Sequence, residues 1–177
     1  MILETQRLYL REMRQSDFPA LCEILQDADV MYAYGHAFDD AEAQGWLDKQ
    51  FERYRETGVG LWAAILKGTD EMIGQCGLIV QDCDGEQVLE IGYLFQKAHW
   101  HRGYATEAAM ACKRYAFDVL GAPEVCSIIR EGNIASQNVA RRNGMAARKR
   151  YIKHGYGMDM PHLVFSVKNE GGNPCAS

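Results

Sequence analysis

A basic residue and a glycine precede a predicted helix in residues 99–109 (HWHRGYATEAA). The first backbone N–H groups of a helix have no partner inside the helix and lie at the positive end of its dipole, so they bind anions. Gly103 lets the backbone approach an anion closely or take a positive φ, and Arg102 adds charge. The spacing indicates a binding site for a diphosphate, a seat formed by backbone amides. So short a pattern also fits a glycine turn that only connects the chain to the start of a helix. It is neither the P-loop, which needs a Lys-Ser/Thr pair, nor the G-x-G-x-x-G dinucleotide pattern.

Glu90 is the only charged residue in the apolar segment 88–95 (VLEIGYLF). A carboxylate at such a place is a candidate general base, acting directly or through a water molecule. The alternative is a structural glutamate at a strand edge or in an ion pair, because such carboxylates are also perturbed without being catalytic.

Asn133 and Ser136 stand at the start of a short predicted helix, residues 133–144 (NIASQNVARRNG). Asparagine is a good N-cap and serine is common in a first turn, which explains both residues without a ligand. The Asn133 amide nevertheless has donor and acceptor capacity for a second partner. Arg141 and Arg142 of the same helix could meet a phosphate, although a solvated helix face explains them equally.

Metal chemistry is not expected. His99 and His101 are separated by one residue, with no third ligand nearby, and the six cysteines are scattered without a C-x-x-C pair. We expect thiols, several of them in the core.

These residues need a scaffold of alternating strands and helices. The hydrophobic patterns predict strands at residues 7–13, 61–66, 72–80, 88–95, 124–130, 147–154 and 162–167, and helices at 16–25, 40–58, 104–120 and 133–144. The order gives an α/β (α+β) domain with a mixed, mostly antiparallel sheet of about seven strands. In the helix after Gly103, an apolar stripe is predicted to run as far as Val119.

The whole chain fits one globular domain. It has 177 residues and a formal charge of −5, which argues against a nucleic-acid partner. Residues 1–168 are expected to form the domain and residues 169–177 (NEGGNPCAS) a flexible tail. The chain shows neither a membrane-spanning run nor a signal peptide, so the expectation is a cytoplasmic protein without a membrane partner.

Three segments in order resemble the GNAT superfamily of acetyl-CoA-dependent N-acetyltransferases. Residues 90–108 look like its motif A, residues 133–145 resemble the motif that follows, and residues 4–17 (ETQRLYLREMRQSD) resemble the start of the RimJ/RimL-like branch, which acetylates ribosomal proteins and small amines. The matches span about Leu3 to Val167. Ordered matches on the expected elements are much more specific than one short motif.

The resemblance implies a GNAT-like fold with two central strands that splay apart around the pantetheine arm of acetyl-CoA. It implies that Leu94 and Gln96 lend backbone groups to that arm and that the amide near Leu94 faces the thioester oxygen. It places the pyrophosphate and pantetheine contacts at His101, Arg102, Gly103, Tyr104, Ala105, Thr106, Asn133 and Ser136. Trp100 departs from the Gln or Arg of many relatives, which leaves Arg102 as the certain side-chain cation of the seat.

The same resemblance implies how the reaction proceeds. Glu90 would deprotonate the amine and Ser136 would protonate the leaving thiolate, while Tyr115 and Tyr151 are further proton-donor candidates. Core packing is the better explanation of Tyr115, as it is of Trp46, Phe51 and Tyr54. Residues 31–38 (MYAYGHAF) are expected to contact the acceptor.

The acceptor is not specified by the chain. A protein N-terminus or a small amine fits equally, and a homodimer is plausible by resemblance alone. Two other classes remain: a CoA-binding regulatory domain without turnover, and a nucleotide-binding module suggested by the phosphate seat.

Overall fold

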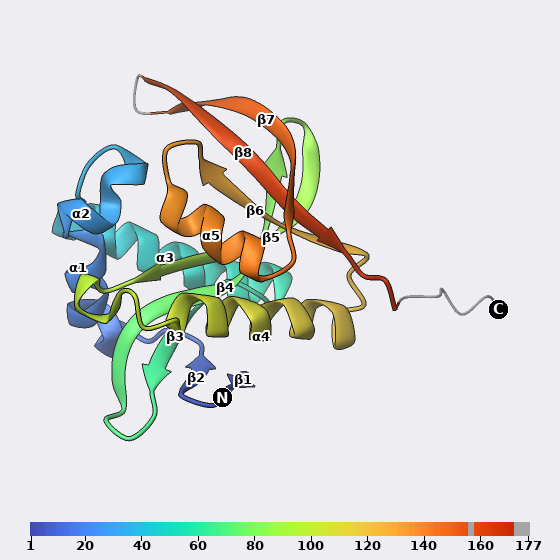
Figure 1. The fold of residues 1–177 in the computed structure, drawn as a ribbon. Coiled ribbons are helices and arrows are strands. Elements are labelled where there is room, and N and C mark those ends of the chain that lie inside the picture. Colours follow the sequence, from blue (N-terminus) through green and yellow to red (C-terminus); the bar gives the residue numbers. More distant parts are fainter. Residues whose placement is uncertain (156–157, 172–177) are drawn as a thin grey trace.

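A single eight-stranded sheet organises the chain in the computed structural model, which describes residues 1–155 and 158–171 (Figure 1). The spatial order of the strands is β1-β2-β3-β4-β5-β6-β8-β7. Every neighbouring pair is antiparallel except β5 and β6. The strands are β1 (Leu3–Glu4), β2 (Leu8–Arg11), β3 (Leu61–Leu66), β4 (Glu71–Cys83), β5 (Glu86–Phe95), β6 (Glu124–Arg130), β7 (Ala146–Gly155) and β8 (Met158–Lys168).

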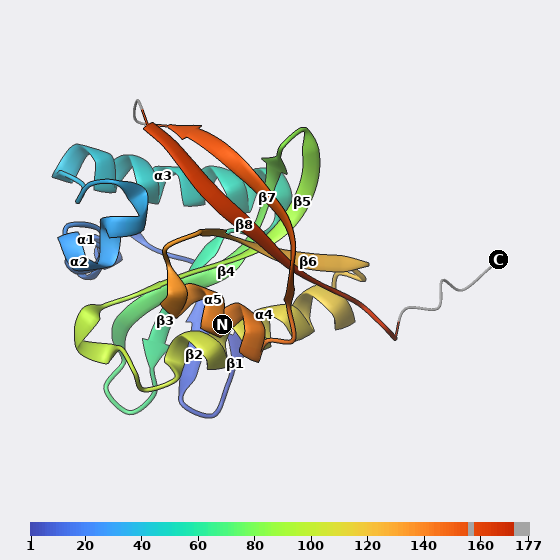
Figure 2. The same ribbon diagram turned by 45° about the horizontal axis from the view of Figure 1, so that its top comes forward.

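Helices cover both faces of the sheet. They are α1 (Phe18–Leu25), α2 (Ala28–Met31), α3 (Asp40–Thr57), α4 (Tyr104–Asp118) and α5 (Ile134–Arg142), with short 3-10 turns at η1 (Gln15–Asp17), η2 (Tyr32–Tyr34) and η3 (Lys97–His99). Figures 1 and 2 show α4 and α5 on one face and α3 on the other. The arrangement buries one apolar layer against each face, as an α/β sheet requires.

Two apolar cores lie on opposite sides of β3–β5. The core beneath α4 is centred on fully buried Trp62 and includes Ala108 and Cys112 of the helix. The core beneath α1 and α3 includes Leu21 and Leu47. Strand β5 lies between β4 and β6 and is covered on both faces, which explains why its sequence is apolar at nearly every position.

Local signals set several element ends. Asp39 and Glu42 form a capping box at the start of α3, and Gly58 ends that helix in the left-handed region at φ 74°. Asp84 and Gly85 join β4 to β5 with φ values of 58° and 86°, the positive-φ pair of a type I′ hairpin turn.

The fold class predicted from the sequence is confirmed, with three differences in detail. The additional strand β1 has two residues, which is too short to show an alternating pattern. Residues 28–34 form α2 and η2 where a loop was expected. Val119 was wrongly placed on the buried stripe: α4 ends at Asp118 and the Val119 side chain is 64 % exposed.

The expected tail, residues 169–177, lies beyond β8, and from residue 172 onward it is outside the described residues. Within the described ranges, no helix has the length and apolar character needed to span a membrane.

Candidate active site

Strands β5 and β6 separate shortly after they meet. Their only parallel pairing in the described chain joins Glu90 to Cys126, although both strands continue for several residues. In a continuing parallel ladder the Ile128 N–H would donate to the Ile91 carbonyl. Instead, Ile128 N donates to Glu90 Oε1 at 3.2 Å and Ser127 Oγ donates to the Ile91 carbonyl at 2.8 Å. Two side chains therefore satisfy the backbone groups that the separation would leave unpaired.

The free edge of β5 beyond this point presents the backbone groups of Tyr93 and Phe95. Alternate residues of an antiparallel strand bond to opposite neighbours. Gln96 N donates to the Ile73 carbonyl of β4 at 3.0 Å, so Leu94, two residues earlier, also directs its backbone toward β4. This corrects the expectation that Leu94 and Gln96 supply backbone groups to the opening.

A cavity of about 720 Å³ begins at this opening and extends past η3 to the start of α4. Its lining brings together residues that are widely separated in sequence. Among the residues predicted for the cofactor it includes Leu94, His101, Gly103, Tyr104, Ala105, Thr106, Asn133 and Ser136. The lining also contains Tyr32 of η2, so the cavity reaches from the glycine loop to the segment predicted to border the acceptor.

The glycine loop presents a row of free amides. His101 and Gly103 have φ values of 60° and 83°, and the hydrogen bonds of the described residues include none donated by the backbone N–H groups from His101 to Thr106. These amides lie at the N-terminus of the long helix α4. Such an arrangement fits a diphosphate, because each oxygen can accept from an otherwise unsatisfied N–H group.

A second cavity, of about 640 Å³, lies on the outer side of the loop. It shares His101, Gly103 and Thr106 with the first, and Arg114 and Arg142 add positive charge to its lining. Arg142 lines both cavities, so the structure brings it to the site. Arg141, in contrast, bonds to side chains of α5 and lies over the Phe165 ring.

An N-terminal clamp on the loop was missed by the sequence analysis. Arg7 Nη1 donates to the Arg102 carbonyl at 2.8 Å, and its guanidinium lies 4.4 Å from the centre of the Tyr104 ring. Glu107, in the first turn of α4, accepts from Arg7 Nε at 2.7 Å and from Thr5 Oγ1 at 2.6 Å. Both donors help to keep the Glu107 pKa below its usual value against the opposing effect of burial, so the carboxylate stays ionised. The contacts span about a hundred residues, which no local pattern reveals.

Two of the predicted cofactor residues lie outside both cavities. The Gln96 side chain is buried and donates to Glu23 Oε2 at 2.9 Å and to the Met72 carbonyl at 3.2 Å, so it anchors the turn after β5. The Arg102 side chain is exposed, while its carbonyl is held by Arg7.

Asn133 and Ser136 position the first turn of α5. Asn133 Oδ1 accepts from Ser136 N at 3.1 Å, which confirms the N-cap prediction. The Tyr93 hydroxyl reaches across from β5 and donates to the Ser136 carbonyl at 2.8 Å. Tyr93 therefore ties α5 to β5 where the strands separate.

Glu90 lies at the base of the opening on the sheet face that α3 covers. Burial raises its pKa to about 7, although the Ile128 amide, Lys153, Arg53 and Gln81 act in the opposite direction. The Gln81 amide donates to Oε2 and Ile128 N to Oε1. A carboxyl group with this pKa changes its charge near neutrality, as a general base requires.

The two tyrosines considered as proton donors, Tyr115 and Tyr151, lie in different parts of the molecule. Tyr115 packs edge-on against Trp62 at 5.7 Å, within the core beneath α4, which supports the packing interpretation. Tyr151 lies on β7 beside the His162 ring at 6.0 Å, on the face shared with Glu90.

The aromatic and imidazole side chains before the glycine loop have distinct roles. Trp100 Nε1 donates to the Phe95 carbonyl at 2.8 Å and so fixes the path from β5 to the loop. His99 lines the cavity, and its buried Nδ1 has no hydrogen-bond partner in the part of the chain that the structure describes. The described part of the chain contains no group of three or more His, Cys, Asp or Glu side chains placed to bind a metal ion.

Comparisons with known proteins agree with this geometry. The sequence profile described as "Acetyltransferase (GNAT) domain" matches residues 7–146. An uncharacterized Bacillus subtilis (strain 168) protein, YkkB, is 39 % identical over 144 residues, covering 81 % of this chain and 84 % of that protein. An acetyltransferase structure from Agrobacterium tumefaciens str. C58 superposes with a TM-score of 0.80 and 29 % identity over 94 % of each chain.

A more distant solved structure has the same fold. RimL, described as a ribosomal L7/L12 α-N-protein acetyltransferase in complex with coenzyme A, superposes with a TM-score of 0.73 at 19 % identity, covering 94 % of this chain and 97 % of RimL. Together with the profile match over most of the sequence, these findings establish that the chain belongs to the GNAT family of N-acetyltransferases.

Proposed function

We propose that this protein transfers an acetyl group from acetyl-CoA directly to a primary amine within a ternary complex. The observation that carries the proposal is the cavity, which joins the free amides of the glycine loop to the opening between β5 and β6. This one path can hold the diphosphate of coenzyme A at its outer end and direct the pantetheine arm toward the face that carries Glu90.

The residues fit acetyl-CoA, which supplies the activated acyl group when it binds. The amides from His101 to Thr106 are free to receive the diphosphate, and Arg142 adds charge at the same end. The backbone groups of Tyr93 and the N–H of Phe95 are available to pair with the pantetheine amides like an added strand, whereas the Phe95 carbonyl already accepts from Trp100 Nε1. An N–H group at this edge is also placed to stabilise charge on the thioester oxygen.

Glu90 and Ser136 complete the proposed chemistry. Glu90 accepts a proton from the amine, directly or through water, because burial has brought its pKa close to neutrality. Ser136 lines the cavity at the first turn of α5, where its hydroxyl can give a proton to the departing thiolate. An α-amino group, with a pKa of about 8, needs less help than a lysine side chain, with a pKa of about 10.4.

Two kinds of acceptor fit this proposal: a protein N-terminus, as the name of RimL indicates for that enzyme, and a small-molecule amine. The part of the cavity near η2, with Tyr32, is the proposed acceptor side.

The direct test is release of free thiol from acetyl-CoA in the presence of a panel of primary amines, with coenzyme A affinity measured in parallel. Acetylation of at least one amine supports the proposal. Tight coenzyme A binding without thiol release for any amine would support a non-catalytic CoA-binding domain instead. Displacement of coenzyme A by ATP at comparable concentration would support a nucleotide-binding module.

A further inference from the structure

Three cations that form no ion pair among the described residues lie near the sheet face of Glu90. They are Arg53 of α3, Arg130 at the end of β6 and Lys153 of β7. The described residues form seven ion pairs, and none of the seven includes these three side chains. In a chain of formal charge −5, three such cations around one site are unexpected.

The strand register places two of these cations on the sheet face of Glu90. Glu90 pairs with Cys126, and Arg130, four residues after Cys126, points to the same side because strand side chains alternate. Across the sheet, Arg130 stands opposite His162 and His162 opposite Tyr151. Lys153 follows two residues after Tyr151 and so shares this face.

Arg53 approaches from the helix that covers this face. Its Nη1 donates to Gln50 Oε1 at 3.2 Å, and the same oxygen accepts from Leu61 N at 3.0 Å. Burial lowers the pKa of this half-buried guanidinium, and Glu90 is close enough to act in the opposite direction. The hydrogen-bond partner of this partly desolvated cation is a neutral amide, so a substrate anion would add to the stabilisation that Glu90 gives it when ionised.

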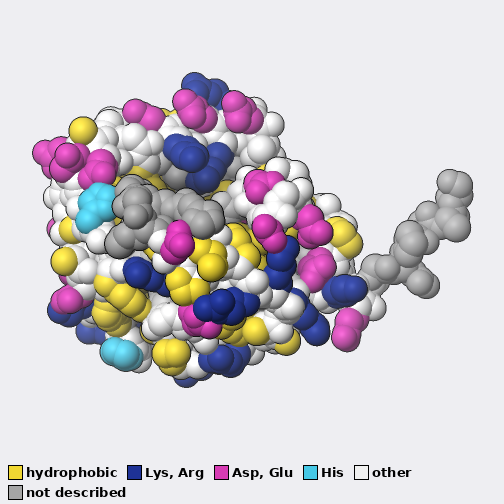
Figure 3. Space-filling model, turned by 90° about the horizontal axis from the view of Figure 1, so that it is seen from above, with side chains coloured by type: hydrophobic (Ala, Val, Ile, Leu, Met, Phe, Trp, Pro, Cys, Tyr) yellow, Lys and Arg dark blue, Asp and Glu magenta, His cyan; other side chains and the backbone are white. Residues whose placement is uncertain are grey.

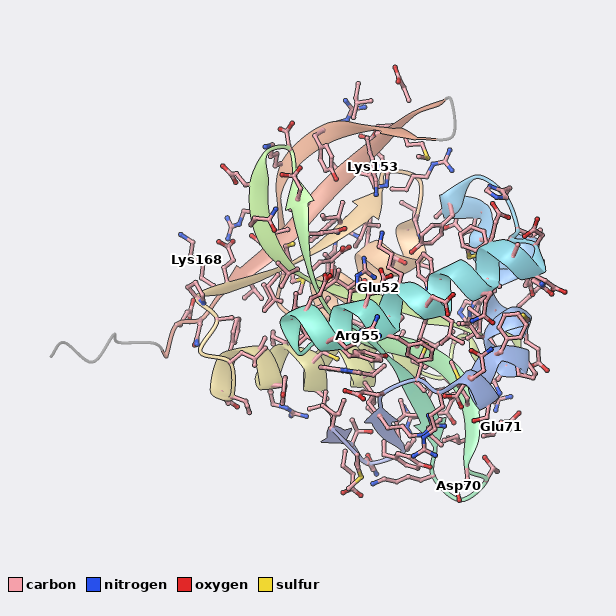
Figure 4. All side chains as sticks on the ribbon, turned by 180° about the vertical axis from the view of Figure 1, so that it is seen from behind. Glu52, Arg55, Asp70, Glu71, Lys153 and Lys168 are labelled. Atoms are coloured by element: carbon pink, nitrogen blue, oxygen red, sulfur yellow. The ribbon has the colours of Figure 1, made fainter. Side chains whose placement is uncertain are left out.

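One member of the cation group, Arg130, adjoins the proposed acceptor end of the cavity. Arg130 Nη1 donates to the Tyr32 carbonyl at 2.9 Å, and Tyr32 itself lines the cavity. In Figure 3, Lys and Arg side chains lie inside a hollow of this surface, with Asp and Glu side chains mostly around its rim. Figure 4 shows Lys153 above α3, and Glu52, the acidic neighbour of Arg53, is exposed.

We propose that the acceptor is a primary amine that also carries a carboxylate, which Arg53, Lys153 and Arg130 bind while the amine reaches Glu90. This inference rests on the proposed acetyltransferase function and narrows its substrate class. A guanidinium and a carboxylate form strong charge-assisted hydrogen bonds, whereas a polyamine would bring further positive charge toward the same three cations. The carboxylate can belong to a free amino acid or to an acidic residue near a protein N-terminus.

The acceptor test compares molecules that differ only in the carboxylate. L-leucine is paired with L-leucinamide, and the peptide Ser-Glu-Ala-amide with Ser-Gln-Ala-amide, with spermidine as the cationic acceptor. Thiol release is measured at saturating acetyl-CoA, and kcat/KM is corrected for the fraction of free amine. The carboxylate member of at least one pair should be preferred by about tenfold or more. The pair that shows the preference identifies the source of the carboxylate.

Arg53→Gln tests the proposed contact, with Arg55→Gln as its matched control. Arg55 belongs to the same helix, is exposed and lies on the side of α3 away from Lys153 in Figure 4. Arg53→Gln should raise KM for the carboxylate acceptor about tenfold and change kcat/KM for its amide less than about twofold. Arg53→Lys should restore part of the loss, and Lys153→Gln should act in the same direction as Arg53→Gln.

The outcomes separate this inference from the proposed function. Equal use of both pair members, preference for spermidine, or an equal loss for both acceptors in Arg53→Gln would overturn the carboxylate inference while acetyl transfer stands. Absence of thiol release with every amine would overturn the proposed function, and the inference with it. A readout without turnover is thermal stabilisation of the CoA-bound protein, which should be larger with N-acetyl-leucine than with N-acetyl-leucinamide.

Discussion

Glu90 combines two roles at one position. Its carboxylate satisfies the Ile128 amide that the separation of β5 and β6 leaves unpaired, and it lies on the sheet face that α3 covers. The structural contact fixes the carboxylate, and burial moves its pKa to about 7. The glutamate that completes the strand separation therefore has a pKa in the range that the proposed role of general base requires.

Replacing Glu90 by glutamine should change the pH dependence of activity. In the wild-type protein, kcat/KM should fall as the pH drops through about 7, because Glu90 becomes protonated there. Glu90→Gln should lower kcat/KM by about a hundredfold at neutral pH and remove this limb of the profile. Glu86→Gln, an exposed change on the same strand, is the control. A profile that keeps its limb in Glu90→Gln would show that another group is the base.

The same substitution should change stability in a pH-dependent way. Because the folded-state pKa of Glu90 is raised from 4.5 to about 7, its neutral form favours folding, and that contribution is complete below pH 4.5 and lost as the pH rises through about 7. The shift of about 2.5 units corresponds to at most about 3 kcal/mol. Urea denaturation at pH 5 and pH 8 should therefore show wild type losing stability relative to Glu90→Gln at the higher pH. A difference independent of pH would contradict the raised pKa.

The start of helix α4 is an element assembled from two distant parts of the chain. Its first turn contains Glu107, a carboxylate beside a seat proposed for a diphosphate, and Arg7 of the N-terminal segment neutralises it. Arg7 also holds the Arg102 carbonyl, so one side chain fixes both the charge and the path of the loop.

Removing Arg7 should weaken coenzyme A binding although Arg7 lines neither cavity. Arg7→Gln should raise the Kd for coenzyme A by about tenfold, because ionised Glu107 then repels the diphosphate and the loop loses its anchor. Arg7→Gln combined with Glu107→Gln should recover part of the affinity, and calorimetric titration measures both. Identical affinities for the single and double variants would show that loop anchoring, and not charge, explains the loss.

Gly103 should be sensitive to a single added methyl group. Its φ of 83° strains any other residue, and a Cβ would lie 3.4 Å from Arg7 Nη2. Gly103→Ala should therefore cost about 1 kcal/mol in the apo protein and weaken coenzyme A binding further. Gly45→Ala is the control, since nothing lies within 4 Å of its added Cβ. Unchanged affinity in Gly103→Ala would place the diphosphate elsewhere.

At the scale of the whole molecule, the sheet consists of two parts joined at one point. Strands β1–β5 form one part and β6–β8 the other, with the Glu90–Cys126 pairing between them. Ser127, Glu90 and Tyr93 add side-chain contacts across the gap. A ligand between the strands would therefore connect both parts of the molecule and stabilise the folded state by mass action.

Coenzyme A should protect a defined set of amides from hydrogen exchange. At a concentration of about 100 Kd it should add about 2.7 kcal/mol to the free energy of unfolding. Local protection should appear at residues 101–106, whose amides donate no hydrogen bond among the described residues, and at Tyr93 and Phe95, whose amides face the opening by their register. The hairpin turn at Asp84 and Gly85 should be unchanged and serves as the internal reference. Protection confined to other segments would contradict the proposed path of the coenzyme.

The sequence by itself determined the longer helices and strands, the glycine loop and the lone charge in β5, because these depend on neighbours within a few residues; the short elements β1, α2 and η2 were not found. Periodicity indicated both α3 and α4, and local turn chemistry set Asn133 as an N-cap and Gly103 as the entry to α4. The family resemblance added the order of these parts and the separation of the two strands.

Only the tertiary structure decided which groups meet. The backbone groups of Tyr93 and Phe95 face the opening, because the alternate residues of β5, such as Gln96, direct their backbone groups toward β4. The contact of Arg7 with the loop, and the approach of Arg53 and Lys153 to Glu90, join residues far apart in sequence. Sequence patterns report local conformation, whereas strand register, burial and long-range charge are properties of the packed chain, and these decide the chemistry of the site.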